Sequence, residues 1–169
     1  MADAKHIAQV NVGILKAPLD SPEVAEFVAW LAPINAIADQ APGFVWRLQT
    51  EAGDATALRI FADTEALLVN MSVWESVESL VAYVYRSPHI AVLRRRREWF
   101  EKMVQPHLAL WWVAPGHRPT ISEAEDRLRR IREVGPTAYA FSFEKAYPAS
   151  GPVSEAFDAR ALIRHAPSR

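Results

Sequence analysis

The stretch LLVNMSVWES, residues 67–76, decides the fold. Its alternate positions fall into two sets: Val69, Met71 and Val73, and Asn70, Ser72 and Trp74. Alternation with a period of two predicts a β-strand whose side chains point to opposite faces of a sheet. Ser76 then begins a helix, because its hydroxyl can cap free backbone N–H groups. A strand with one apolar and one polar face, followed at once by a helix, is typical of an α+β domain.

The same alternation recurs near the start of the chain, in IAQVNVGIL at residues 7–15. One side carries Ala8, Val10, Val12 and Ile14, and the other carries Gln9, Asn11 and Gly13. We expect the two strands to pair antiparallel, so that Asn11, Asn70 and Trp74 share one sheet face. The valines then lie on the opposite face.

The remaining elements follow from helix caps, periodicity and Pro or Gly stops. Helices are predicted over residues 22–41, 76–85, 88–103 and 120–133, with a short one near 155–163. Further strands are predicted over residues 44–49 and 107–113, with a short arm at 58–61 and an edge strand at 140–143. Thr120 and Glu123 have the spacing of a capping box, which predicts that each side chain binds the other's backbone N–H.

The element order βαββαβ, followed by a helix and an edge strand, predicts an α+β fold of ferredoxin-like type. The sheet is expected to have four antiparallel strands with helices on one face. The other face, which carries aromatic and small polar side chains, needs a cover, so we expect a second copy to pack there, as a homodimer that forms a dimeric α+β barrel with a cavity between the sheets. The domain is placed at residues 1–143 and a loosely held C-terminal tail at 144–169.

Composition narrows the classes of function. Nineteen basic and twenty acidic residues give a formal charge of -1, which disfavours nucleic acid and anionic membrane surfaces as partners. No stretch approaches the roughly 20 apolar residues needed to span a bilayer. The chain has no cysteine, which excludes disulfides and thiolate chemistry. This composition fits a reducing compartment, so a cytoplasmic location is expected.

Four strings carry a family resemblance: PGFVWRLQ at 42–49, LLVNMSVWESVESL at 67–80, SPHIAVLRRRREWF at 87–100 and LALWWVAPGHRPT at 108–120. Over residues 6–143 the chain resembles a largely bacterial family of domains of unknown function in the dimeric α+β-barrel superfamily. More distantly, VWES followed by a helix and SPH is similar to the antibiotic-biosynthesis monooxygenases, which place a strand tryptophan and a helix histidine at similar positions. Such relatives include cofactor-free oxygenases and haem-binding enzymes, so the resemblance implies an architecture but not one mechanism.

His89, Asn70 and Trp74 are the candidate catalytic residues. His89 lies just inside a predicted helix start, where the helix dipole would lower its pKa and favour a neutral imidazole acting as a base or ligand. The alternative is a surface histidine near a helix cap. Asn70 and Trp74 would orient a substrate from a rigid strand, or else contact the partner subunit.

Six further residues are expected to bind substrate: Asn11, Arg47, Ser72, His107, Trp111 and His117. Adjacent Trp111 and Trp112 point to opposite faces of their strand, so at most one of them lines the cavity, and core packing is the alternative. His107 and His117 lie at the expected rim, a position that suits either a pocket or a solvated loop.

Four successive arginines, residues 94–97, spread around a helix and therefore form no concentrated phosphate-binding stripe. Arg97 is expected near the apolar side of that helix, paired with Glu75 or Glu101 because an unpaired buried guanidinium is costly. The five histidines show no HxH or HExxH spacing, so no dedicated metal site is predicted.

The leading hypothesis is a small enzyme that oxygenates an apolar, aromatic or polyketide-like molecule without flavin or metal. In such a reaction the substrate supplies the electrons, and His89 assists proton removal. One alternative is haem binding, with His89 or His107 as the axial ligand. Another is a non-catalytic module that holds a small ligand. All three hypotheses use the same cavity.

Overall fold

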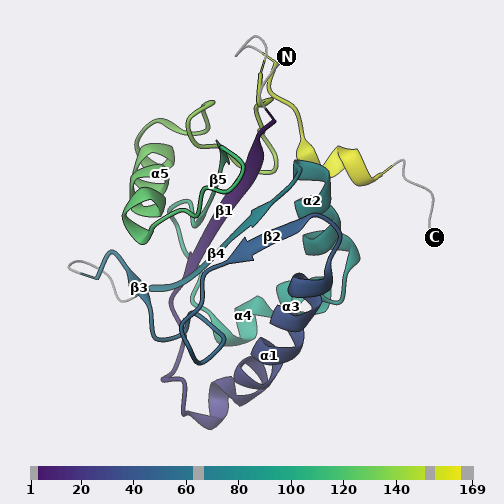
Figure 1. The fold of residues 1–169 in the computed structure, drawn as a ribbon. Coiled ribbons are helices and arrows are strands. Elements are labelled where there is room, and N and C mark those ends of the chain that lie inside the picture. Colours follow the sequence, from purple (N-terminus) through teal and green to yellow (C-terminus); the bar gives the residue numbers. More distant parts are fainter. Residues whose placement is uncertain (1–3, 63–66, 151–154, 165–169) are drawn as a thin grey trace.

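The two alternating segments form the centre of one sheet in the computed structural model, which describes residues 4–62, 67–150 and 155–164 (Figure 1). They are strands β1 (His6–Gly13) and β4 (Leu67–Trp74), which pair antiparallel as predicted. Their register places three pairs directly opposite each other on one face: Ile7 with Trp74, Gln9 with Ser72, and Asn11 with Asn70. The predicted convergence of Asn11, Asn70 and Trp74 on one face is therefore confirmed.

Three further strands complete an antiparallel sheet of five. They are β2 (Phe44–Arg47), β3 (Arg59–Ile60) and β5 (Leu108–Val113). The strand order is β2-β4-β1-β5, and β3 pairs with the start of β4 beyond the end of β2. The short arm predicted at 58–61 is thus a real strand. We call the face that carries Gln9, Asn11, Asn70 and Ser72 the polar face, and the opposite face, with Val10, Val12, Val69 and Val73, the valine face.

The helices that follow Ser76 and Thr120 begin where the sequence places their caps. Their bounds are α1 (Ala25–Gln40), α2 (Val77–Arg86), α3 (His89–Arg94), α4 (Arg96–Trp99) and α5 (Ile121–Val134), with 3-10 turns at Pro22–Val24 and Ala159–Ile163. The Ser76 hydroxyl accepts from the Ser79 N–H at 3.1 Å and so starts α2. The helix predicted to continue to residue 103 ends at Trp99, because Phe100 adopts an extended backbone and bridges to Leu15.

The valine face is covered by α5 of the same chain. Ala124, Leu128 and Ile131 form an apolar stripe along α5, and they are buried against Val10, Met71 and Trp111. Figure 1 shows α5 on one side of the sheet and α1, α2 and α3 on the other. The expectation that all helices lie on one face is therefore wrong. The reason is that α5 carries enough apolar surface to bury the valine face itself. The expectation that the polar face is left for a second copy is wrong as well, because helices of the same chain lie over Asn11, Asn70 and Trp74.

The polar face is apolar at one end, where it forms a second core with α2. Trp74 and Leu110 pack there against Leu80, with Phe141 covering the edge. The edge strand predicted at 140–143 is reduced to one antiparallel bridge, in which Phe141 exchanges two backbone hydrogen bonds with Leu110. Described parts of the C-terminal segment join this core through Ala146, Tyr147 and Ala159.

The packing of α5 on the sheet predicts a large effect of Leu128→Ala. Because Leu128 is fully buried, the substitution should lower the free energy of unfolding by about 2–5 kcal/mol. Arg130→Ala on the exposed side of the same helix is the control and should change it by less than about 0.5 kcal/mol. Urea denaturation of both variants measures this, and equal stabilities would contradict the placement of α5.

Candidate functional site

A ladder of hydrogen-bonded side chains crosses the polar face from β1 to β4. The Gln9 amide nitrogen donates to Asn70 Oδ1 at 2.8 Å and to Ser72 Oγ at 2.9 Å. Asn11 donates to Gln9 Oε1 at 3.4 Å, and the Trp74 indole donates to Ser72 Oγ at 2.9 Å. Gln9 is only 6% exposed, so these partners replace the water that its amide would otherwise bind. The ladder fixes the amide orientations on rigid strands.

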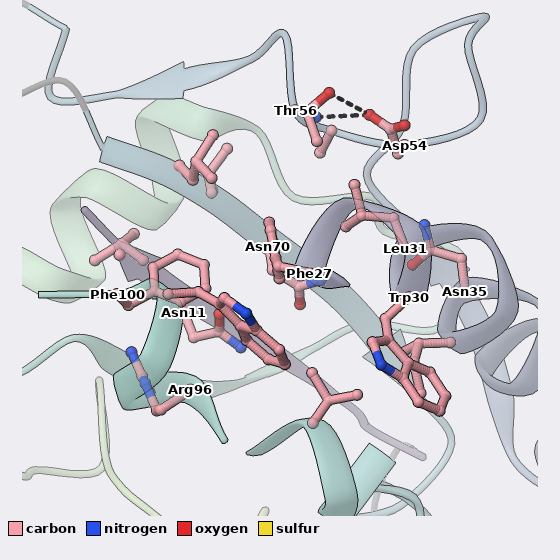
Figure 2. A pocket seen from close by; sticks show the side chains of 18 of the residues that line it. Asn11, Phe27, Trp30, Leu31, Asn35, Asp54, Thr56, Asn70, Arg96 and Phe100 are labelled. Atoms are coloured by element: carbon pink, nitrogen blue, oxygen red, sulfur yellow. Dashed lines mark hydrogen bonds between the residues drawn. The ribbon is translucent and has the colours of Figure 1, made fainter. Parts of the chain in front are cut away.

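Helices α1, α3 and α4 stand over this ladder and leave a cleft. The cleft comprises two cavities, of about 190 Å³ and about 530 Å³. Residues that line both include Asn11, Asn35, Arg47, Asn70, His89 and Arg96. Figure 2 shows Asn11 and Asn70 on the sheet between Trp30 of α1 and the Arg96–Phe100 side of the cleft. The arrangement combines an amide floor with an aromatic wall, which suits a planar apolar molecule that carries a few polar atoms.

His89 lines both cavities of the cleft. Its Nδ1 lies 3.2 Å from the Val84 carbonyl oxygen, and a carbonyl can only accept, so Nδ1 carries the proton in the neutral ring. Burial lowers the pKa of His89 below 6.5, while the bond to Val84 partly opposes that shift. A neutral imidazole with an unprotonated Nε2 is therefore the form at pH 7, and such a nitrogen can act as a base.

Aromatic stacking holds His89 in place. Trp74 stacks on Tyr83 with ring centroids 4.9 Å apart, and Tyr83 lies 5.0 Å from the His89 ring. Burial raises the pKa of Tyr83 well above its ordinary value, so its phenol stays neutral; its hydroxyl donates to the Ile34 carbonyl of α1. Trp74 itself is fully buried. Trp74 borders the larger cavity without exposed surface, so it acts on the cleft through Ser72 and Tyr83, which makes it a positioning residue.

Arg47 reaches the cleft because of an irregularity in β2. The register between β2 and β4 shifts between Phe44 and Trp46, so Arg47 lies opposite Ser72 on the polar face. Its guanidinium donates to Asp39 at 2.8 Å and to the Gly53 carbonyl at 2.7 Å. The charge of Arg47 is thus already paired before any ligand binds.

Arg96 is a charged cleft residue that sequence reasoning missed. It donates to His107 Nε2 at 3.0 Å, so His107 is neutral, in line with a pKa that burial and then Arg96 and Arg132 lower. The predicted inward residue, Arg97, is exposed instead. The helix is interrupted at Arg95, whose φ of -95° and ψ of 0° separate α3 from α4 and shift the phase by one position. To predict this shift, the sequence would have needed a helix-capping residue at position 95, and Arg95 makes no side-chain cap.

Two predicted substrate-binding residues lie away from the cleft. Trp111 is fully buried on the valine face, where its indole donates to Glu123 at 2.9 Å. His117 is half-exposed and bonds to the same carboxylate at 2.7 Å. Thr120 caps α5 as predicted, but Glu123 binds Trp111 and His117 in place of completing the capping box. The structure thus separates Trp111 and His117 from Asn11, Asn70 and the other predicted site residues.

The described residues offer no dedicated metal site. Residues 4–62, 67–150 and 155–164 contain no group of three or more His, Asp or Glu side chains placed to hold a metal ion. Within those same ranges, none of the helices combines the length and the apolar character that crossing a lipid bilayer requires.

The fold and the cleft define an α+β domain whose antiparallel sheet carries a polar cavity floor beneath its own helices. The chain belongs to the DUF3291 family, a domain of unknown function, whose family model matches residues 6–157. The match reaches beyond residue 143 into the C-terminal segment. No curated protein and no solved structure matches the chain.

The geometry of His89 predicts its tautomer and its titration. Nitrogen-15 spectra at pH 7 should show a neutral ring protonated at Nδ1, with a titration midpoint below 6.5. Because the folded pKa is below the unfolded one, unfolding takes up a proton in that window. Stability supplied by neutral His89 is present above pH 6.5 and is lost as pH falls through the folded pKa. A midpoint at or above 6.5, or protonation at Nε2 alone, would contradict the site.

Proposed function

We propose that the cleft binds a planar aromatic or polyketide-like molecule and that the protein oxygenates it without flavin or metal. The observation that carries this proposal is the neutral His89, which lines a cleft with an amide floor and an aromatic wall and has only its Nδ1 bonded to Val84. The choice of oxygenation, among reactions that begin by proton removal, rests on the resemblance to antibiotic-biosynthesis monooxygenases. The absence of cysteine supports a cytoplasmic setting.

The proposed reaction converts an activated CH₂ group into a ketone. His89 Nε2 removes a proton from the CH₂ or its enol, while Asn70 and Asn11 donate hydrogen bonds to the resulting enolate oxygen. The enolate carbon gives electrons to O₂ and forms a hydroperoxide, which loses water. One oxygen atom ends in the ketone and the other in water, and the substrate supplies all four electrons.

For the fold we propose ferredoxin-like topology and membership of the dimeric α+β-barrel superfamily. The strand order β2-β4-β1-β5 with antiparallel neighbours supports this assignment. The homodimer also stays a prediction. Because α1, α2 and α3 lie over the polar face, where the second copy was expected, and α5 buries the valine face, a dimer would have to use another surface of the described chain. Sedimentation at micromolar concentration distinguishes a monomer from a dimer.

Haem binding is the second candidate, and one observation favours it. Histidines that bind metals usually donate their other ring nitrogen to a carbonyl or carboxylate, as His89 Nδ1 does to Val84. His107 fits less well, because its Nε2 already accepts from Arg96. Arg96 could bind a haem propionate. A Soret band that appears on adding haem and is lost in His89→Gln, but kept in His117→Gln, would support this candidate.

Binding in the cleft is tested with the neutral fluorescent probe phenylnaphthylamine. Asn70→Trp fills the space above the cavity floor and should weaken probe binding by about tenfold or more. Arg94→Gln, an exposed change on α3, is the control and should leave binding unchanged. Circular dichroism confirms that each variant is folded. Equal binding by wild type and Asn70→Trp would contradict the cleft as the ligand site.

Catalysis is tested with anthrone, whose CH₂ group lies between two aryl rings. We expect oxygen uptake and ketone formation, with kcat lowered about a hundredfold to ten-thousandfold in His89→Gln. His117→Gln, which changes a histidine outside the cleft, should keep full activity. Equal rates for wild type and His89→Gln would contradict the assigned base. Probe binding without turnover would support the non-catalytic binding module.

A further inference from the structure

Arg96 is a cation of the cleft without an ion-pair partner among the described residues. Its side chain donates to the neutral His107 ring, and its guanidinium also lies 5.8 Å from the Phe100 ring centre. The neighbouring Arg95 differs, because it pairs with Glu26 and Glu98. A guanidinium has five N–H donors, so one bond to His107 leaves most of them for water or a ligand.

The surroundings of Arg96 favour an anion. Burial, and then the neighbouring Arg97, lower the pKa of Arg96. In the free protein, therefore, no negative charge among the described residues offsets the cost of burying its guanidinium. Arg47 also lines both cavities, but it is paired with Asp39. Two acidic residues line the cavities: Asp54 is engaged by the Thr56 N–H and hydroxyl at 2.8 and 2.6 Å, and Glu144 pairs with Arg160 at 3.3 Å. A bound anion would supply the negative partner charge for Arg96.

The position of Arg96 also fixes where such an anion would sit. Arg96 borders both cavities of the cleft, and Phe100 follows it on the same wall. Figure 2 shows both residues across the amide floor from Trp30. A planar ligand that lies on Asn11 and Asn70 would therefore reach the guanidinium with one edge. Carboxylates and sulfonates match a guanidinium because two parallel N–H···O bonds can form.

We propose that the cleft selects an aromatic anion, with Arg96 binding the anionic group and the aromatic body lying between Trp30 and Phe100. This inference rests on the proposed binding function and adds the charge of the ligand. His107 holds the guanidinium toward the cleft by accepting one N–H.

A matched pair of dyes tests the proposal on the full-length protein. Anilinonaphthalene sulfonate and phenylnaphthylamine share one aromatic body, and only the first carries a negative charge. Wild type should bind the sulfonate about tenfold tighter than the neutral dye. Arg96→Gln should abolish that preference while binding of the neutral dye changes less than twofold. Arg96→Lys should restore part of the preference, and Arg94→Gln should keep all of it.

The outcomes separate the two proposals. A preference that is absent in wild type, or unchanged in Arg96→Gln, overturns the role of Arg96 but leaves the cleft as a ligand site if Asn70→Trp still weakens both dyes. If Asn70→Trp changes the binding of neither dye, then the claim that the cleft is the ligand site and the inference about Arg96 are both overturned. Loss of neutral-dye binding in Arg96→Gln assigns Arg96 a structural role and also overturns the inference.

Discussion

The structure depends on the buried amide of Gln9 at the middle of the sheet. A primary amide cannot be enclosed without hydrogen-bond partners, because losing its water costs more than packing returns. Asn70 and Ser72 of β4, together with Asn11 of β1, meet that requirement across the strand pair. Each partner is itself polar, so the ladder extends over the polar face and keeps that part of the sheet from binding an apolar helix face closely.

The two faces of the sheet are covered differently as a result. On the valine face, α5 packs its apolar stripe directly against the strands and buries them. On the polar face, α2 packs closely only where Trp74 and Leu110 are apolar. Over Asn11 and Asn70, α1, α3 and α4 leave the cleft instead. The site therefore lies where the sheet is polar, and His89 and Arg96 enter it from the helices.

Local patterns predicted the strands and the amide floor, because a period of two fixes which side chains share a face. They did not predict three features that depend on breaks in regularity or on tertiary packing. The shift in β2 turns Arg47 toward Ser72, and the interruption at Arg95 exchanges Arg97 for Arg96. The side of the sheet that α5 covers follows from its connection and its apolar stripe, which periodicity within single elements does not determine. Trp111 was assigned to the cleft because alternation within β5 does not give its register against β1, which pairs Trp111 with Ala8 on the valine face.

The most direct test of this account is a nuclear magnetic resonance titration of the nitrogen-15-labelled protein with anilinonaphthalene sulfonate. The account predicts that the side-chain amide signals of Asn11 and Asn70 and the indole signal of Trp30 shift together and saturate. The indole signal of Trp111, enclosed beneath α5, should stay in place. Shifts at Trp111 with unchanged amide signals would contradict the claim that the polar face forms the ligand site.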